Sequence, residues 1–467
     1  MNKKYKYLMK NIGLLTLSSF ATKLLSFFLV PLYTNILTTT EYGTYDLFNT
    51  TIGVLLPILT LNIQESVLRF ALEKDYNRHA IVSIATRFLL RGCLIVGIAV
   101  VVCSFFGIGG LTYTNAIFFF LMYFSQTFSG IILAYIRGID KIAELSISSV
   151  ICSIITIGCN IVFLVLFKWG LSGYFLANII GPLVQSLYLV VKAKIAREVS
   201  LKGTYKEEQK EMLAYSKPMI ANSIAWWINN ASDRYIVIFF CGLAENGIYS
   251  VASKIPTILN VFQSIFNQAW TLSAVRDFDP EDKSGFFAKT YSAYNCMMTI
   301  LCSGIIVFDK ILAKFLYAKD FYTAWKFVPW LTIAIVFGAL SGVFSGVFSA
   351  VKNSKIFAQS TMAGAISNVV LNILFTPALG ALGAAIATAV CYVVVWAMRL
   401  IQSKKYIKLR INLTRDIASY ILLVVQAIVL LLVDTTRVYL IEVVLLLMIC
   451  GLYRKEVVNV AKKIIKR

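Results

Sequence analysis

The sequence predicts an all-α polytopic membrane protein with about fourteen transmembrane helices, because apolar runs of about 20 residues recur along the whole chain. Hydrophobic residues make up 59% of the 467 residues, and the mean hydropathy is +0.77. Only 14% of the residues are charged, against about 25% in a soluble domain. Helices are the expected spanning elements, since each satisfies its own backbone hydrogen bonds, and the short alternating segments of a membrane barrel are absent.

The first half of the chain begins with a basic segment, Met1–Lys10, followed by an apolar run too long for a cleavable signal. We therefore expect a first membrane helix with its N-terminus in the cytoplasm. The six helices predicted for this half lie at about 11–36, 45–70, 81–107, 113–136, 145–167 and 172–191.

The second half follows a basic, polar stretch at 192–216, which is the longest hydrophilic segment between predicted helices. Its six helices are predicted at about 217–241, 247–272, 287–308, 327–351, 356–377 and 380–401, and two more at about 417–433 and 437–453. The predicted organisation is thus a six-helix lobe (1–191), a cytoplasmic linker (192–216), a second lobe (217–401), and a loop, two helices and a basic tail (402–467).

The net charge is +21, and the distribution of the basic residues indicates a membrane topology rather than a nucleic-acid-binding surface. Lys and Arg gather in alternate loops, which is the positive-inside pattern and predicts that both termini are cytoplasmic. The exception is 309–326, which is predicted outside yet carries four lysines, and its apolar spacing suggests an amphipathic segment on the outer interface. The nine cysteines form no CxxC pair, so neither a metal site nor a disulfide framework is expected.

A short motif indicates that the two halves are repeats. Glu41-Tyr42-Gly43-Thr44-Tyr45, in the predicted link after the first helix, is echoed by Glu245-Asn246-Gly247-Ile248-Tyr249 in the second half. Six helices per half is an even number, so both halves enter the membrane in the same direction. In transporters, such parallel repeats face each other across a central cavity.

Positively charged residues within or beside the predicted spans are the candidate substrate-binding residues of that cavity. Lys23 lies near mid-depth, where a cation costs about 2.5–3.5 kcal/mol on insertion scales unless it finds a partner or a polar cavity. Unpaired cations there would suit an anionic phosphate or pyrophosphate. The candidates are Lys23, Arg234, Lys254 and Arg69.

Each of these cations could instead have a structural role that does not involve a substrate. Lys23 and Lys254 could extend to an interface. Asp233 could pair with Arg234, although adjacent residues on a helix point in different directions. Glu65 and Arg69 have the i, i+4 spacing of a salt bridge.

Amide and indole side chains in the same helices are the candidate sugar-contacting residues, although helix packing and interfacial anchoring are the more common reasons for any one such residue. They are Asn49, Gln64, Trp226, Asn230 and Gln268. The candidate ion-coupling residues are Asp46, Glu65 and Asp233. No ATP-binding loop or hydrolase motif is present, so we expect a transporter without a cofactor, driven by a proton or sodium gradient or by the gradient of its substrate. Gly338, Gly342 and Gly346 predict close helix packing.

Four segments resemble the polysaccharide transporter family, the lipid-linked oligosaccharide flippases of the multidrug/oligosaccharidyl-lipid/polysaccharide exporter superfamily. They are Thr22-Lys23-Leu24-Leu25-Ser26-Phe27, Pro31-Leu32-Tyr33, the Glu41–Tyr45 motif and Tyr135-Ile136-Arg137-Gly138. The resemblance implies two lobes in a V around a central cavity, alternating access, and cations in that cavity. It also implies that an undecaprenyl-pyrophosphate-linked sugar unit is moved across a bacterial plasma membrane.

Three functions remain in view. The leading hypothesis is a flippase for capsule, exopolysaccharide, O-antigen or teichoic acid assembly, working beside glycosyltransferases and a polymerase. A drug–cation antiporter of the same superfamily would favour an acidic cavity, which the surplus of cations argues against. A membrane glycosyltransferase or polymerase would need a large hydrophilic loop with paired carboxylates, and 192–216 is too short and too basic.

Overall fold

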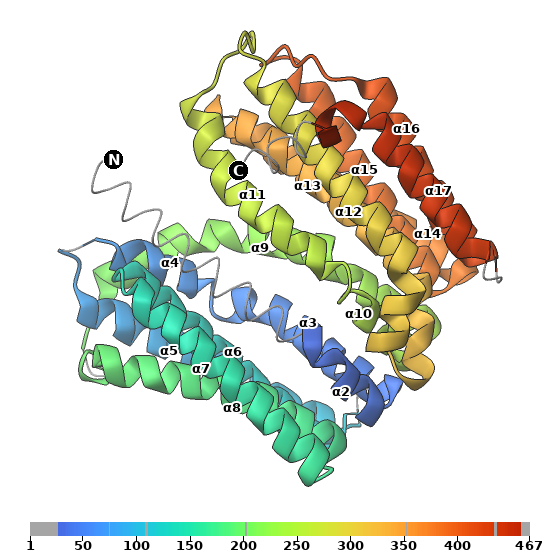
Figure 1. The fold of residues 1–467 in the computed structure, drawn as a ribbon. Helices are drawn as coiled ribbons and strands as arrows, with labels where there is room; N and C mark the ends of the chain where they lie inside the picture. The colour runs from blue at the N-terminus through green and yellow to red at the C-terminus, as the bar shows by residue number, and fades with distance from the viewer. Residues whose placement is uncertain are drawn as a thin grey trace. The chain divides into compact units, whose positions relative to one another are not determined.

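The computed structural model describes residues 27–73, 75–107, 111–200, 203–351, 353–433 and 437–458, and every regular element in these ranges is a helix (Figure 1). The side chains of residues 268, 269, 271, 272 and 354 are outside this description. The described helices confirm the all-α membrane fold. The chain divides into two compact units, the first ending at Trp227 and the second beginning at Ile228.

The first unit is organised around its fourth predicted helix, α6, which contacts α3, α4, α5, α7 and α8. Its core is formed by large apolar side chains such as Tyr123 and Phe175, which are fully buried. The helices are α2 (Val30–Ile36), α3 (Thr39–Leu59), α4 (Ile63–Ala71), α5 (Arg78–Phe105), α6 (Tyr113–Gly138), α7 (Ile142–Asn160) with a π-helical end η2 (Ile161–Leu166), α8 (Gly170–Ala193) and the 3₁₀ turn η3 (Ile195–Arg197).

The Glu41–Tyr45 motif belongs to a helix, and its prediction as a link was wrong. Helix α3 begins at Thr39 because Thr38 and Glu41 form a capping box. The Thr38 hydroxyl accepts the Glu41 N–H at 3.2 Å, and Glu41 Oε2 accepts the Thr38 N–H at 2.8 Å. Tyr42 and Tyr45 then pack on Tyr174 of α8, with ring centroids 5.9 and 4.4 Å away. The motif therefore fixes the start of α3 and its contact with α8.

The second predicted helix, 45–70, is in fact two helices that meet at 64°. Leu61 and Asn62 have φ near +52° and +54°, a conformation that ends α3 just after Pro57. The Asn62 amide donates to Ser223 at 3.1 Å, which helps to hold this unusual backbone. A broken span exposes backbone groups that a continuous helix would satisfy itself.

The second unit has a similar plan, with its fourth predicted helix, α13, contacting α11, α12, α14, α15 and α16. Its second predicted helix is also broken, between α10 and α11, and α10 starts at the motif echo just as α3 starts at the motif. The helices are α10 (Leu243–Ala252), α11 (Thr257–Arg276), α12 (Phe286–Leu316), the 3₁₀ helix η4 (Lys319–Lys326), α13 (Val328–Ala350), α14 (Ser354–Leu379), α15 (Ala381–Ser403), α16 (Leu413–Leu432) and α17 (Arg437–Leu452).

Two predicted loops are largely helical. The predicted linker 192–216 is shorter than expected, because α9 (Lys206–Cys241) begins within it and carries the chain from the first unit into the second. The predicted interfacial segment 309–326 begins as the last two turns of α12, and only η4 is a separate element. η4 buries Phe321, Ala324 and Trp325, so this segment packs on the protein and not only on an interface.

Nine of the described helices are long and apolar enough to span a membrane, or ten if the bent pair α3–α4 forms one span. The count of fourteen stays a prediction. Helices α10 and α17, with 10 and 16 residues, are too short to qualify, and α9 and α11 are not among the nine.

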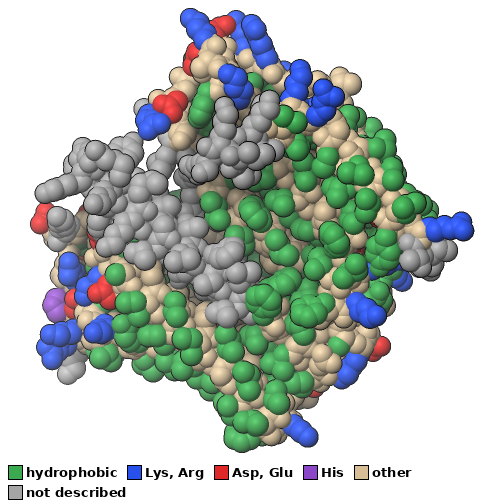
Figure 2. Space-filling view, in the orientation of Figure 1, with side chains coloured by type: hydrophobic (Ala, Val, Ile, Leu, Met, Phe, Trp, Pro, Cys, Tyr) green, Lys and Arg blue, Asp and Glu red, His purple; other side chains and the backbone are tan. Residues whose placement is uncertain are grey.

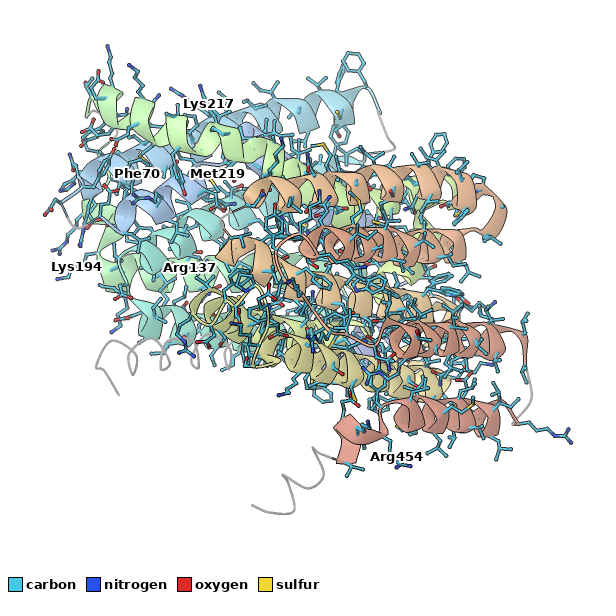
Figure 3. The ribbon with its side chains drawn as sticks, turned by 90° about the horizontal axis from the view of Figure 1, so that it is seen from above. Phe70, Arg137, Lys194, Lys217, Met219 and Arg454 are labelled. Atoms are coloured by element: carbon cyan, nitrogen blue, oxygen red, sulfur yellow. The ribbon has the colours of Figure 1, made fainter. Side chains whose placement is uncertain are left out.

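The surface suits a membrane environment. Hydrophobic side chains cover much of the visible face in Figure 2, whereas Lys and Arg lie mainly near the helix ends. Arg137 in the last turn of α6 and Lys194 after α8 lie toward the same end of the first unit (Figure 3). That end is the one for which the sequence predicts a cytoplasmic location.

Candidate functional site

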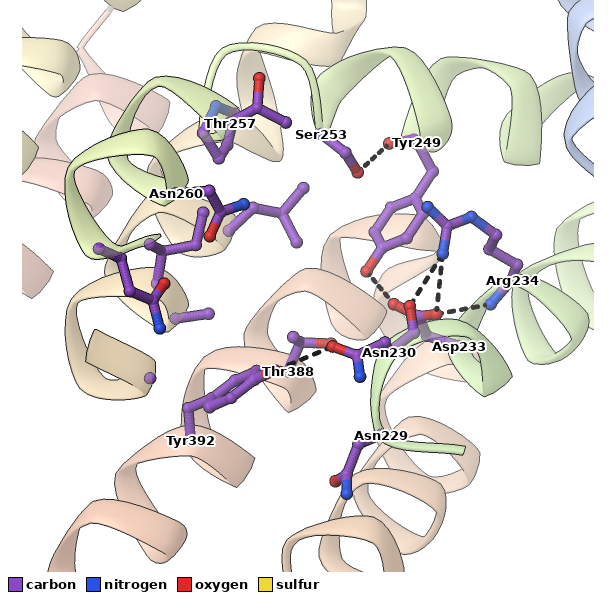
Figure 4. Close-up of a pocket in the computed structure, with 16 residues that line it drawn as sticks. Asn229, Asn230, Asp233, Arg234, Tyr249, Ser253, Thr257, Asn260, Thr388 and Tyr392 are labelled. Carbon is purple, nitrogen blue, oxygen red and sulfur yellow. Dashed lines mark hydrogen bonds and ion pairs between the residues drawn. The ribbon is translucent and has the colours of Figure 1, made fainter. Parts of the chain in front are cut away.

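A polar pocket of about 230 Å³ lies within the second unit (Figure 4). It is enclosed by α9, the broken pair α10–α11, α13 and α15. Its lining residues are Asn229, Asn230, Asp233, Arg234, Tyr249, Ser253, Pro256, Thr257, Asn260, Gln263, Leu331, Ala334, Ile335, Gly338, Thr388 and Tyr392. An amide- and hydroxyl-rich pocket inside an apolar helix bundle is a candidate binding site.

Asp233 anchors one wall of this pocket. It is 6% exposed, and its carboxylate accepts a hydrogen bond from the Tyr249 hydroxyl at 2.6 Å. The carboxylate also folds back to accept the backbone N–H of Arg234 at 2.9 Å. Tyr249 is the tyrosine of the motif echo, so the repeated motif supplies a pocket residue in this unit.

Arg234 pairs with Asp233, which is the structural alternative that the sequence left open. Its Nη1 lies 3.9 Å from Asp233 Oδ1 and donates to the carbonyl of Asn230 at 3.0 Å. Adjacent helical residues point apart, but the arginine side chain is long enough to curl back toward the helix backbone. The pocket therefore contains a local ion pair whose charges largely offset each other.

Behind Asp233, a chain of buried polar groups joins α9 to α14 and α15. The Ser232 hydroxyl donates to the Ile228 carbonyl at 2.6 Å and lies 3.3 Å from Asn368 Oδ1, and Asn368 Nδ2 lies 3.4 Å from the Thr388 hydroxyl. Asn372 donates to the Asn368 carbonyl at 2.8 Å. In an apolar bundle such bonds hold the helices in a fixed register around the acid.

On the opposite wall, the pocket meets the break between α10 and α11. Ser253, Pro256 and Thr257 line it there, and the Thr257 hydroxyl donates to the carbonyl of Lys254 at 2.5 Å. Lys254 was expected two turns into a continuous helix, but it lies in the break and is not among the lining residues.

Comparison with known proteins places the chain in a family. A family model described as "Polysaccharide biosynthesis protein" matches residues 8–271, which is more than half of the chain. The chain belongs to the polysaccharide biosynthesis protein family. Among curated proteins, no relative matches it.

Solved structures share the fold of this polysaccharide biosynthesis family member. The lipid II flippase MurJ in an inward closed conformation has a TM-score of 0.71 at 15% identity, over 96% of this chain and 99% of that chain. An inward-facing multidrug resistance MATE family transporter of the MOP superfamily has a TM-score of 0.63 at 15% identity, over 82% and 94%. A MOP superfamily transporter from Pyrococcus furiosus has a TM-score of 0.53 at 14% identity, over 85% and 94%. At these identities the similarity shows a shared fold.

Of the predicted site residues, the structure brings Asn230, Asp233 and Arg234 together in the pocket. Lys23 lies outside the described residues, as does the side chain of Gln268. The roles assigned to all of these residues stay predictions.

The other predicted residues lie in the first unit. Arg69 pairs with Glu73 at 2.6 Å, not with Glu65 as the spacing suggested, and its side chain is about half exposed. Asn49 accepts a hydrogen bond from Gln126 at 3.0 Å. The remaining placements are Gln64 against Gly130, Trp226 partly exposed on α9, and Asp46 buried in α3.

Sequence reasoning missed the contribution of α15 to the pocket. The Tyr392 hydroxyl donates to Asn230 Oδ1 at 3.2 Å, and Thr388 lies one turn before it. Two polar side chains spaced i, i+4 in the apolar first part of α15 were the available signal.

Proposed function

We propose that this protein is a flippase for a lipid-linked oligosaccharide in a bacterial plasma membrane. Its membership of the polysaccharide biosynthesis protein family carries the proposal, and the fold shared with MurJ and MATE transporters supports it. The proposed cargo is an undecaprenyl-pyrophosphate-linked repeat unit, moved by alternating access to the outer leaflet for capsule, exopolysaccharide, O-antigen or teichoic acid assembly. Glycosyltransferases and a polymerase are the proposed partners.

The pocket chemistry is compatible with that cargo. Asn229, Asn230, Asn260 and Gln263 supply amide donors and acceptors, which suit sugar hydroxyls. Arg234 supplies the planar donors that phosphates bind.

Ion coupling is proposed to act through the Asp233–Arg234 pair. A proton or sodium ion taken up by Asp233 would weaken its attraction for the guanidinium, which lies 3.9 Å away. Arg234 would then be available to an anionic ligand, and release of the cation would restore the internal pair. This exchange links one cation to one anionic cargo without a nucleotide or a resident cofactor. Asp46 and Glu65 remain candidates for the same task in the first unit.

A drug–cation antiporter is the second candidate, because the buried acid of the pocket is a suitable partner for an organic cation. The two functions differ in the charge of the cargo. An antiporter would depend on Asp233 and tolerate neutralisation of Arg234, whereas the flippase mechanism needs both residues.

The proposal is tested by neutralising the candidate cations in the source bacterium. The double variant Lys23→Gln/Arg234→Gln should lose surface polysaccharide while the membrane level of the protein stays unchanged. Arg276→Gln is the matched control, since that arginine forms an exposed pair with Asp277 outside the pocket. Normal polymer in the double variant would refute the assignment.

A further inference from the structure

The last two helices meet α12 through a buried pair of acids that the pocket does not use. Helices α16 and α17 pack against α12 and against each other. Asp309 lies about two turns before the end of α12, and Glu442 lies in the second turn of α17. Both side chains are completely buried, at 0% exposure.

The Gln426 amide lies beside the Glu442 carboxyl, but no described donor reaches either acid in good hydrogen-bond geometry. Among the described residues, all four carboxyl oxygens of Asp309 and Glu442 are buried without a partner. The two side chains are close enough for the charge of Glu442 to act on Asp309. Gln426 of α16 completes the cluster: its amide nitrogen donates to the Glu442 carbonyl at 3.3 Å, while its own side-chain oxygen is also without a partner.

Apart from the Gln426 amide nitrogen, which donates to a backbone carbonyl, the side-chain polar atoms of this cluster are acceptors. Burying an ionised carboxylate without a partner is very costly, and two neighbouring carboxylates repel each other as well. A protonated carboxyl removes both costs, because it is neutral.

The charged groups near Asp309 and Glu442 do not neutralise the two acids as a bound proton would. The charge of Lys310 attracts Asp309, but the Lys310 ammonium lies over the Trp325 ring, 4.4 Å from the centroid. Asp309 and Tyr439 of α17 are both close enough to Tyr322 of η4 for their charges to act on it. Helices α13 and α16, where they pack here, carry no Lys, Arg, Asp or Glu in the described segments 328–350 and 417–432.

We propose that Asp309 and Glu442 form a proton-binding site that holds one exchangeable proton between α12 and α17, separate from the pocket. The bound proton joins the C-terminal helix to the second unit. Loss of the proton leaves two facing negative charges, so α17 is held to α12 less tightly at alkaline pH.

Carbodiimide labelling of the purified full-length protein tests this site. Dicyclohexylcarbodiimide modifies protonated carboxyls in apolar surroundings, and peptide mass spectrometry locates the adduct. We expect an adduct on Asp309 or Glu442 at pH 6, its loss as the pH is raised, and its absence in Asp309→Asn/Glu442→Gln. Asp416 is the matched control, since it is equally buried but pairs with Arg415 at 3.0 Å and should stay unmodified.

The effect of sodium on the carbodiimide labelling distinguishes a proton-binding site from a metal-ion site. Labelling that is equal in sodium chloride and in choline chloride supports the proposal, whereas protection by sodium overturns it in favour of a metal cation. The proposal is also overturned if neither Asp309 nor Glu442 is labelled at pH 6 in the wild-type protein. This measurement does not depend on the folding of a variant.

Discussion

At the scale of single residues, the chemistry of the pocket depends on how Asp233 is held. Its location near the cation Arg234 could be predicted from the sequence, but the contact between them could not. Helical periodicity places neighbouring side chains on different faces, and only coordinates show the carboxylate accepting the Arg234 N–H at 2.9 Å. Tyr392 and Thr388 were missed for a related reason, because their proximity to α9 is a tertiary contact.

Removing the Tyr249 hydroxyl should weaken this arrangement. It donates to the buried Asp233 carboxylate at 2.6 Å, and a hydrogen bond to a charged group contributes about 1.5–3 kcal/mol. Tyr249→Phe is therefore expected to lower the thermal unfolding midpoint of the purified protein. Tyr294→Phe is the matched control, because the Tyr294 hydroxyl is buried without a partner in the described chain. Equal destabilisation by both changes would contradict the assigned role of Tyr249.

At the scale of elements, helix existence was well predicted, and the breaks and starts were not. The ranges predicted for α13, α14, α15 and α17 agree with the structure within about two residues, the usual uncertainty of helix ends. The breaks after Leu59 and Ala252 escaped prediction because apolar periodicity continues through them. The start of α3 was misplaced because the Thr38–Glu41 capping box was not recognised.

The glycine stripe of α13 illustrates a correct prediction of close packing. A Cβ added at Gly346 would lie 2.5 Å from Trp270 Nε1 and 2.9 Å from Ala274 Cβ, both on α11. Gly346→Val should therefore separate α11 from α13 at a cost of about 1–3 kcal/mol, seen as a lower unfolding midpoint. A Cβ added at Gly304 of α12 has no atom within 4 Å, so Gly304→Ala should leave the unfolding midpoint unchanged or raise it. An unchanged unfolding midpoint in Gly346→Val would contradict the observed packing.

The segment after α17 is held in place by Glu456, which makes this contact sensitive to acid. Its carboxylate accepts from the Ser292 hydroxyl at 2.6 Å and pairs with Arg415 at 2.5 Å. Burial raises the pKa of Glu456, but the bonds from Ser292 and Arg415 outweigh it, so the net pKa is lowered. The stabilisation is thus present above the ordinary glutamate range and is lost as the pH falls through the lowered pKa.

We accordingly expect the wild-type unfolding midpoint to drop at acidic pH by more than that of Glu456→Gln, which lacks the titrating group. Asp277→Asn changes an exposed pair and should leave the acid dependence as it is in the wild type. Parallel pH curves for the wild type and Glu456→Gln would show that this contact does not contribute.

At the scale of the whole molecule, composition and charge pattern were sufficient for the membrane class, since it depends on the bilayer rather than on detailed packing, and the repeat was predicted from the Glu41–Tyr45 motif and its echo. The repeat is visible as a central fourth helix, a broken second helix and a shared motif in each unit. The candidate site was only partly predicted. Lys23 lies outside the described residues, and the supposed surplus of cations is offset at Arg234 by Asp233.

The predicted orientation has its own test. Single cysteines at Lys404 and Asp320, both exposed, are placed in a variant without the native cysteines. An impermeant maleimide should label Asp320→Cys in intact spheroplasts and Lys404→Cys only after permeabilisation. The opposite pattern would invert the topology and place both termini outside.

The central claim is tested most directly in proteoliposomes that contain the purified protein and a labelled undecaprenyl-pyrophosphate-linked oligosaccharide in a single leaflet. We predict that the wild type carries the label to the other leaflet, and that Arg234→Gln and Asp233→Asn each lose this movement while Arg276→Gln retains it. A wild-type protein that leaves the oligosaccharide in its original leaflet, but exchanges an organic cation for protons or sodium, would contradict the account.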